Sequence, residues 1–219
     1  MESLLMDESQ TKLGNSLLCL GMFFLWYMIS FAIALFPWAK MLTETGYDLV
    51  IFHLSEALLM GYLLMRYRRH GLDVNLGSPS RSMFIHFVLA TLGLICVSQF
   101  FATQEPWVAD YLKFSSTADM TLILTLLVIA PIGEEIVFRG FFLQAFLLWG
   151  GKVASAGIVI SAAFFTMIHW QYSDPVTFVS LFMIAVLLAY ARIKSGGLML
   201  PVILHMLLNS ISLGTMLFL

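Results

Sequence analysis

The chain has 219 residues, of which 60% are hydrophobic and only 11% are charged, and its mean hydropathy is +0.93. A typical soluble domain is about half apolar and about a quarter charged, so a water-soluble globule is excluded. The same numbers exclude a disordered chain, and the net charge of -2 gives no basic field for nucleic acid as a partner. The composition therefore indicates an integral membrane protein, with the lipid bilayer as its surroundings.

Seven apolar runs follow one another along the chain. A helix needs about 20 apolar residues to cross a hydrocarbon layer of about 30 Å, and each run reaches or approaches that length. Turn or charge signals separate the runs, such as the basic stretch 66–69. The pattern predicts an all-α fold, a polytopic transmembrane helix bundle of about seven spans. The runs cover roughly residues 16–37, 49–65, 83–102, 121–149, 153–169, 175–192 and 198–218.

We expect a polar N-terminal tail, 1–15, followed by a single transmembrane domain, 16–219. With the N-terminus in the cytoplasm, eight of the 11 Lys and Arg residues lie on the cytoplasmic side and two on the other, as the positive-inside rule favours. The prediction is a multi-pass protein with a cytoplasmic N-terminus, in the inner membrane if the cell is bacterial. The eight are Lys12, Arg66, Arg68, Arg69, Arg81, Lys152, Arg192 and Lys194, and the two are Lys40 and Lys113.

Three ionisable residues lie inside the fourth apolar run: Glu134, Glu135 and Arg139. Each costs about 2.5–3.5 kcal/mol at the centre of a span, so such residues usually mark a functional site. Glu135 and Arg139 are four residues apart with Glu first, the favourable order for an ion pair on one helix face. Glu134 points about 100° away, and we interpret it as the freer carboxylate and a candidate base. A purely structural polar cluster is the alternative.

Further polar residues lie in the fifth and seventh runs. His205 and Asn209 are four residues apart and share one helix face, which favours a functional pair. For His169 alone, a hydrogen bond between helices is an equally good interpretation. With straight helices, His169 lies near the far end of its span, and His205 lies near the start of a span running the same way. A shared site therefore requires staggered or tilted helices, or a bend in 131–150.

The other polar groups in the apolar runs are interpreted as structural or as lining a cavity. His53 and Glu56 share a face of the second run and could pair. His86 stands alone in the third run. The two cysteines, Cys19 and Cys96, lie inside apolar runs and are interpreted as small apolar residues, not as a disulfide.

A carboxylate, two imidazoles and an amide from three helices are sufficient for hydrolysis of a peptide bond by water. A Glu kept from bulk water can act as general base, and a His–Asn pair can donate hydrogen bonds to the oxyanion. The same carboxylate and imidazoles, Glu134, His169 and His205, are also the ligand set of a catalytic zinc. The usual His-Glu-x-x-His zinc motif is absent from the chain, but residue spacing does not decide between the two mechanisms.

Three motifs, in order, resemble those of the CPBP intramembrane proteases, a family named for CAAX proteases and bacteriocin-processing enzymes and also called Abi proteins. The resemblance covers roughly residues 121–210, whereas the first three spans, 16–102, show no matching motif. The motifs are Glu134-Glu135-x-x-x-Arg139, Phe165-x-x-x-His169 and His205-x-x-x-Asn209, the last preceded by Arg192, Gly196-Gly197 and Pro201.

The resemblance implies a CPBP-like catalytic core at 121–218, with the active-site cavity inside the membrane. It implies Glu134 as the base that activates water, assisted by His169. It implies His205 and Asn209 as the oxyanion donors. Glu135 and Arg139 would be supporting residues.

The resemblance also indicates an activity, that of an intramembrane endopeptidase. The implied substrates are membrane-associated proteins or peptides: prenylated CAAX proteins, peptide precursors or C-terminal sorting tags. Family members have been described both as metalloproteases and as metal-independent glutamate proteases. An Asn four residues from a His suits an oxyanion hole better than a zinc shell, so we expect no cofactor, with zinc as the alternative. The competing functions are an ion or proton pathway and a bacteriocin-immunity scaffold.

Overall fold

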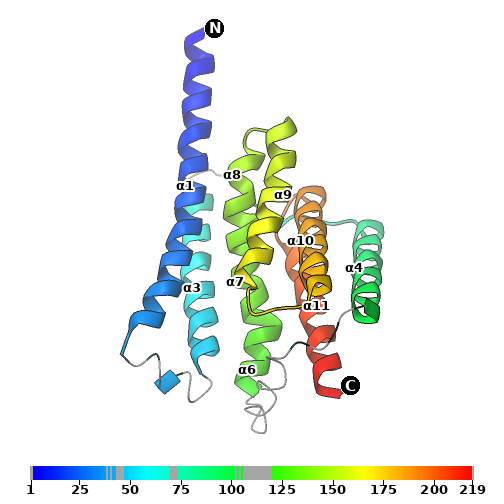
Figure 1. Cartoon of the computed structure of the whole chain (residues 1–219). Helices are drawn as coiled ribbons and strands as arrows, with labels where there is room; N and C mark the ends of the chain where they lie inside the picture. Colours follow the sequence, from blue (N-terminus) through cyan, green and yellow to red (C-terminus); the bar gives the residue numbers. More distant parts are fainter. Residues whose placement is uncertain are drawn as a thin grey trace.

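The computed structural model describes residues 2–37, 39, 41, 42, 47–69, 74–101, 103, 105 and 120–218, and over these the fold is helical without strands (Figure 1). The all-α prediction is confirmed. Lys40 and Lys113, the two cations expected on the outer side, lie outside the described residues. The elements are α1 (Glu2–Leu35), α3 (Asp48–Arg69), α4 (Arg81–Phe101), α6 (Met120–Leu124), η2 (Thr125–Ile129), α7 (Ala130–Glu135), η3 (Ile136–Phe142), α8 (Leu143–Leu147), α9 (Gly151–Ile168), α10 (Pro175–Ser195) and α11 (Met199–Phe218).

The lengths and compositions of these helices confirm a multi-pass membrane bundle. Six helical stretches among the described residues are long and apolar enough to cross a membrane, and α11 carries a shorter apolar stretch, Met199–Thr215. The orientation of the N-terminus and the division into tail, N-terminal spans and catalytic core stay predictions. The six stretches are Glu8–Ile33, Asp48–Arg69, Arg81–Phe101, Met120–Leu147, Gly151–Ile168 and Pro175–Ser195.

Helix α1 begins earlier than the sequence pattern predicts. Residues 1–15 are expected as a polar tail, but the chain is helical from Glu2. Lys12 Nζ lies 2.8 Å from Glu8 Oε1, and such a pair, four residues apart with Glu first, stabilises a helix that water surrounds. Figure 1 shows that this end of α1 projects beyond the rest of the bundle.

The fourth span lies in the middle of the bundle and is not a regular α-helix. Two π-helical segments, η2 and η3, flank the short helix α7, which carries Glu134 and Glu135. Helix α1 packs on η3, α3 packs on α7, and α11 packs on α7 and η2. Every residue from 133 to 145 is buried, so the acids of this span face protein and not lipid. Such π-helical turns occur frequently at functional sites.

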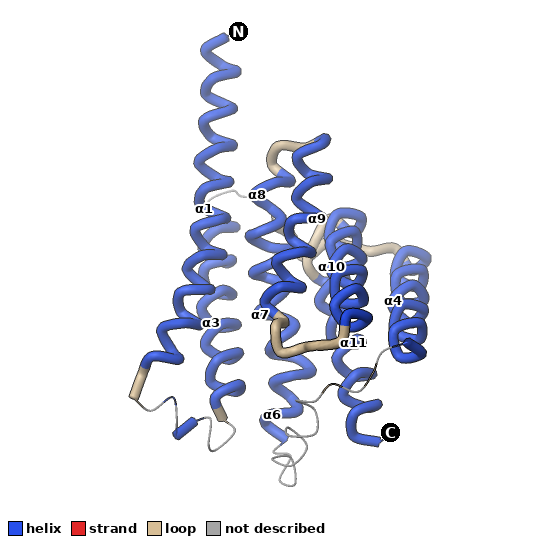
Figure 2. Tube along the Cα trace, in the orientation of Figure 1, coloured by secondary structure: helices blue, strands red, loops and turns tan. Residues whose placement is uncertain are grey.

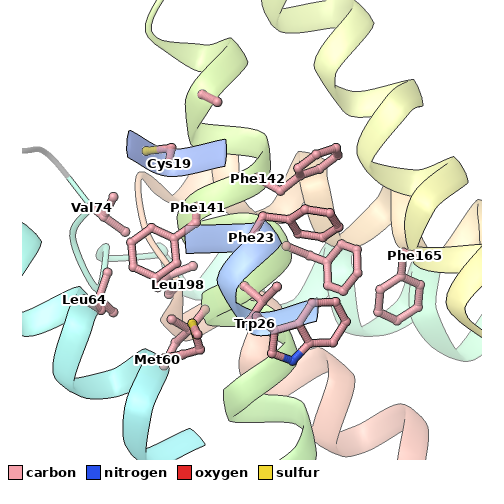
Figure 3. Packing of buried hydrophobic residues seen from close by; sticks show 14 of the residues in the cluster. Cys19, Phe23, Trp26, Met60, Leu64, Val74, Phe141, Phe142, Phe165 and Leu198 are labelled. Carbon is pink, nitrogen blue, oxygen red and sulfur yellow. The ribbon is translucent and has the colours of Figure 1, made fainter. Parts of the chain in front are cut away.

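An aromatic cluster holds η3 against α1 (Figure 3). The ring centroids of Phe23 and Phe142 are 4.3 Å apart, and those of Phe23 and Phe138 are 5.6 Å apart. Trp26 packs edge-on against Phe138. Aromatic pairs in these tilted and edge-to-face arrangements stabilise beyond their buried area. Because lipid offers no hydrophobic drive between helices, such close packing helps to fix the position of η3 in the bundle.

The loop between α9 and α10, residues 169–174, lies at the height of α7 and not at the end of the bundle (Figure 2). Helices α3 and α6 continue beyond that height in the same view. Helix α9 has 18 residues, about 27 Å at 1.5 Å per residue, and it ends beside the middle of the longer fourth span. This stagger is the arrangement that a shared site of His169 and His205 requires.

The turn from α10 to α11 is fixed by the close approach of the backbone at Gly197 to the backbone at Gly77. Gly196 ends α10 with φ +69°, the left-handed conformation typical of a helix-terminating glycine. Gly77 (φ +80°) lies so close to Gly197 that a Cβ on Gly197 would overlap the backbone of Gly77 and Leu76. The Met199 N–H donates to Leu76 O at 2.9 Å. This tight turn sets where α11 begins.

Candidate active site

Glu135 and Arg139 form a buried ion pair, as their spacing predicts. Arg139 Nη1 donates to Glu135 Oε1 at 2.9 Å, and the two residues are 1% and 0% exposed. Arg139 Nη2 donates to Ala185 O of α10 at 3.0 Å, and the guanidinium lies 4.7 Å from the centroid of the Phe165 ring. Because removal of one partner would strand a buried charge, the pair is a strong structural constraint.

The same carboxylate oxygen also binds His205 of α11. His205 Nδ1 lies 2.9 Å from Glu135 Oε1. A carboxylate only accepts, so we assign the hydrogen to Nδ1, which leaves Nε2 as the acceptor of the neutral ring. Glu135 therefore joins Arg139 to His205, a link between residues 70 positions apart that the sequence motifs do not show.

Glu134 lies beside this network, and one of its carboxylate oxygens accepts no hydrogen bond from the described residues. Glu134 Oε2 is buried and has no hydrogen-bond partner among the described residues. It lies 3.9 Å from His205 Nε2, which is too far for a direct hydrogen bond and fits a small molecule held by both atoms. The structure thus distinguishes the two adjacent acids in the way their helix positions predict: Glu135 is engaged, and Glu134 is the freer one.

His169 reaches the site as the cap residue at the end of α9. Its Nδ1 lies 2.7 Å from Phe165 O. A carbonyl only accepts, so we assign the hydrogen to Nδ1 and the lone pair to Nε2. The Phe165 ring lies 4.7 Å from the His169 ring and 5.8 Å from the His205 ring, and His169 interacts electrostatically with Glu134. The structure therefore brings both predicted histidines to the Phe165 ring, in the part of the bundle that holds Glu134.

Asn209 has a structural bond that the sequence analysis does not include. Its Nδ2 donates to Leu126 O, in η2, at 2.9 Å. This bond ties α11 to the π-helical part of the fourth span, one helical turn beyond His205. An amide nitrogen carries two hydrogens, so one N–H remains for a second acceptor.

A catalytic zinc needs three protein ligands around one point. In the part of the chain that the structure describes, no three His, Cys, Asp or Glu side chains are arranged to hold a metal ion. Glu134 Oε2 and His205 Nε2 lie 3.9 Å apart, and the bond from Nδ1 to Glu135 would orient the ring of a metal ligand, but no third ligand is arranged with these two among the described residues. The donor set as arranged does not fit a catalytic zinc. The expectation of a cofactor-free mechanism stays a prediction.

Helix α3 places two more ionisable residues beside this site. His53 Nδ1 lies 3.2 Å from Glu56 Oε2, so these two residues, which their spacing allows to pair, do so. Glu56 is 3% exposed, and a Cβ added to Gly133 would lie 3.3 Å from its carboxyl carbon. From the sequence, Glu56 is interpreted as a structural or cavity-lining residue, and nothing predicts that it lies near Glu134. The one feature of the sequence that could have indicated a functional role was an acidic residue inside an apolar span.

The α9–α10 loop is tied to the segment that follows α4. Glu105 accepts hydrogen bonds from Ser173 N at 2.8 Å, Ser173 Oγ at 2.9 Å and Asp174 N at 3.0 Å. Thr103 N and Oγ1 donate to Asp174 Oδ2 at 2.6 and 3.0 Å. Burial alone would raise the pKa of Glu105, but these donors outweigh it and lower the pKa. The Thr103 N–H likewise lowers the pKa of Asp174. The contacts hold the loop that begins at His169.

Comparison with known proteins agrees with the motifs. A protein of Escherichia coli described as "Uncharacterized 24.3 kDa protein" is 29% identical over 178 residues, which cover 77% of this chain and 81% of that protein. No solved structure matches the chain. Residues 116–211, which contain Glu134 through Asn209, match the family of Rce1-like type II CAAX prenyl endopeptidases. The resemblance to the CPBP family is thus confirmed, and residues 116–211 are its Rce1-like region.

Proposed function

We propose that this protein is an intramembrane endopeptidase that hydrolyses a peptide bond in a membrane-associated protein or peptide, with Glu134 as the general base. The observation that carries the proposal is a buried carboxylate oxygen, Glu134 Oε2, without a hydrogen-bond donor and 3.9 Å from His205 Nε2. A buried acceptor without a donor costs free energy, so its place at the centre of a span favours a role in a reaction. The Rce1-like match supports peptide hydrolysis as the reaction class.

In the first step, a water molecule binds between Glu134 and His169. Both residues present an acceptor, because the Nδ1–H of His169 is directed to Phe165 O. The water donates one hydrogen to each acceptor. As its oxygen bonds to the peptide carbonyl carbon, one proton moves to Glu134 and the carbonyl becomes an oxyanion. A positioned base of this kind contributes about 10²–10⁴-fold to the rate.

In this mechanism His205 and Asn209 donate hydrogen bonds to that oxyanion. The Nδ1–H of His205 donates to Glu135. Before the water attacks, Nε2 takes up a proton from solvent and keeps it throughout the cycle, so that the ring donates from Nε2 to the oxyanion while the proton from water goes to Glu134. The second donor is the Nδ2 hydrogen of Asn209 that Leu126 O does not accept. One donor of this kind in a site without bulk water is worth about 2.7–4 kcal/mol.

In the last step, Glu134 returns its proton to the peptide nitrogen, the C–N bond breaks, and an amine and a carboxylic acid are released. The enzyme is then as it began, with water consumed as the second reactant. Arg139 stays paired with Glu135 throughout. It is a supporting residue, because it holds the carboxylate that orients His205.

Cleavage by the purified protein tests the proposal. The candidate substrates are a prenylated CAAX peptide, a peptide precursor and a membrane peptide with a C-terminal tag, with products identified by mass spectrometry. Glu134→Gln should lower cleavage by about 10²–10⁴-fold, whereas Glu8→Gln, an exposed acid outside the site, should not.

Equal cleavage by the wild type and Glu134→Gln would refute the assigned base. Loss of cleavage on addition of a chelator, with recovery on addition of zinc, would contradict the metal-free mechanism. Failure of the wild type to cleave any of the peptides would favour an ion pathway or an immunity scaffold.

A further inference from the structure

Three buried carboxylate oxygens at the site have no hydrogen bond among the described residues: Glu135 Oε2, Glu134 Oε2 and Glu56 Oε1. The charge of Glu135 is balanced by Arg139, which leaves Glu134 and Glu56. The two residues are 9% and 3% exposed, and they come from different helices. Glu56 of α3 lies against Gly133, the residue before Glu134. Its carboxyl interacts electrostatically with Glu134, and the Trp26 indole N–H lies near enough to it to act as a donor. The two acceptors therefore belong to one part of the bundle interior.

No Lys or Arg among the described residues forms an ion pair with Glu56 or Glu134. Arg139 is paired with Glu135. Their ion-pair partners are imidazoles, 3.2 Å from Glu56 and 3.9 Å from Glu134. Imidazoles are neutral at pH 7 unless their surroundings favour the charged form. Two buried carboxylates of like charge are costly without a cation beside them.

We propose that Glu56 and Glu134 form a subsite for a cationic group of the substrate, the ammonium of a Lys or the guanidinium of an Arg close to the scissile bond. An ammonium offers three N–H donors and a guanidinium five, enough for Glu56 Oε1 and for one lone pair of the Glu134 carboxylate, whose other lone pairs remain for the catalytic water. The positive charge also compensates the acids in a medium where charge is expensive. This inference rests on the proposed endopeptidase function and names its substrate class, peptides with a basic residue near the cleaved bond.

Glu56 lies outside the Rce1-like region, residues 116–211. The subsite is therefore formed where an N-terminal span, α3, packs on helix α7 of that region. The contact also gives a reason for glycine at position 133, because a side chain there would meet the Glu56 carboxyl. On this reading the N-terminal spans contribute to substrate choice, and the Rce1-like region carries the chemistry.

Binding of a cation is testable without cleavage. The full-length protein in detergent micelles is heated in the presence of hexylammonium, with hexanol at the same concentration as the neutral control. A ligand that binds only the folded state raises Tm, so the wild type should gain stability from hexylammonium but not from hexanol. Glu56→Gln should lose this difference. Glu56→Asp, which keeps the charge, and Glu8→Gln, which is remote from the site, should retain it.

An equal response of the wild type to hexylammonium and hexanol would overturn the subsite, and so would an undiminished hexylammonium response in Glu56→Gln. If the Gln variant does not fold, the wild-type comparison and the Asp variant still decide.

Cleavage then shows whether the cation belongs to the substrate. Peptides that differ only by Lys or norleucine are compared at each position around the scissile bond. At one position, Lys should raise kcat/KM of the wild type about tenfold or more, the value of a charged hydrogen bond, and Glu56→Gln should remove that preference. Equal cleavage of both peptides by the wild type would overturn the subsite and leave the endopeptidase function standing. If no peptide is cleaved, the endopeptidase function fails, whereas the Tm comparison still decides whether a cation binds.

Discussion

Arg139→Ala measures how strongly the buried ion pair supports the site. The change removes the bond of 2.9 Å to Glu135, the bond of 3.0 Å to Ala185 O and the contact with the Phe165 ring at 4.7 Å. Because Glu135 is 0% exposed, its charge would be stranded, at a cost of about 3–5 kcal/mol in the free energy of unfolding. The lost contact with the ring adds about 0.5–2 kcal/mol, and a proton on His205 would offset part of the sum. We expect a net loss of about 3–5 kcal/mol.

The assay is denaturant unfolding of the purified variants followed by tryptophan fluorescence. Lys12→Ala is the matched control, because it breaks a pair of the same spacing, Lys12 with Glu8 at 2.8 Å, that is exposed to solvent. It should change stability far less, since exposed pairs are well solvated. The double variant Glu135→Gln/Arg139→Met leaves no stranded charge and should be more stable than Arg139→Ala. An unfolding midpoint of Arg139→Ala equal to that of the wild type would refute the reasoning, as would a double variant that is no better.

Two further predictions concern a turn and a loop. Gly197→Ala should destabilise the protein by about 1–3 kcal/mol, because its Cβ would overlap the backbone of Gly77. Gly14→Ala, in the interior of α1 with nothing within 4 Å of the new Cβ, should not lower the unfolding midpoint and should raise it slightly, because Ala favours a helix over Gly. The pKa of Glu105 is lowered in the folded protein. Its bonds to the loop therefore stabilise the folded state fully at pH values above the ordinary Glu pKa of about 4.3. This stabilisation is lost as the pH falls through the lower pKa of the folded state. Protection of the Ser173 amide from hydrogen exchange should therefore fall in that acid range, and Glu105→Ala should lack the protection already at pH 7. A Glu105→Ala variant that keeps full protection at pH 7 would show that this contact does not hold the loop.

Apolar length and turn residues locate the helices along the chain well. The predicted run 175–192 lies within α10, and the run 198–218 coincides with α11 to within one residue. The positions of the helices relative to one another along the bundle axis cannot be predicted from apolar length and turn residues. They depend on packing and on close backbone crossings such as that of Gly77 and Gly197, which leave no period in the sequence. The level of the loop 169–174 is therefore a result of the structure alone.

In the candidate site, contacts within one helix are predictable from the sequence, whereas contacts between helices are not. The pair of Glu135 and Arg139 follows from a spacing of four residues on one helix, and the structure confirms it. The bond from Glu135 to His205 joins residues 70 positions apart, and it depends on which helix packs beside the fourth span. The contact of Glu56 with Gly133 is of the same kind. An acid inside a span indicates a site, but it does not identify the residues around it.

His205 connects the two adjacent acids, and this connection has a consequence for the variants. Its Nδ1 lies 2.9 Å from Glu135 and its Nε2 lies 3.9 Å from Glu134, so one ring touches the structural carboxylate and faces the reactive one. Any change that releases Glu135 from Arg139 frees that carboxylate to move, and the imidazole that it orients moves as well. Arg139 variants should therefore lose stability and cleavage together. Glu134→Gln keeps every hydrogen bond described for Glu135, so it should lose cleavage while the unfolding midpoint stays near that of the wild type.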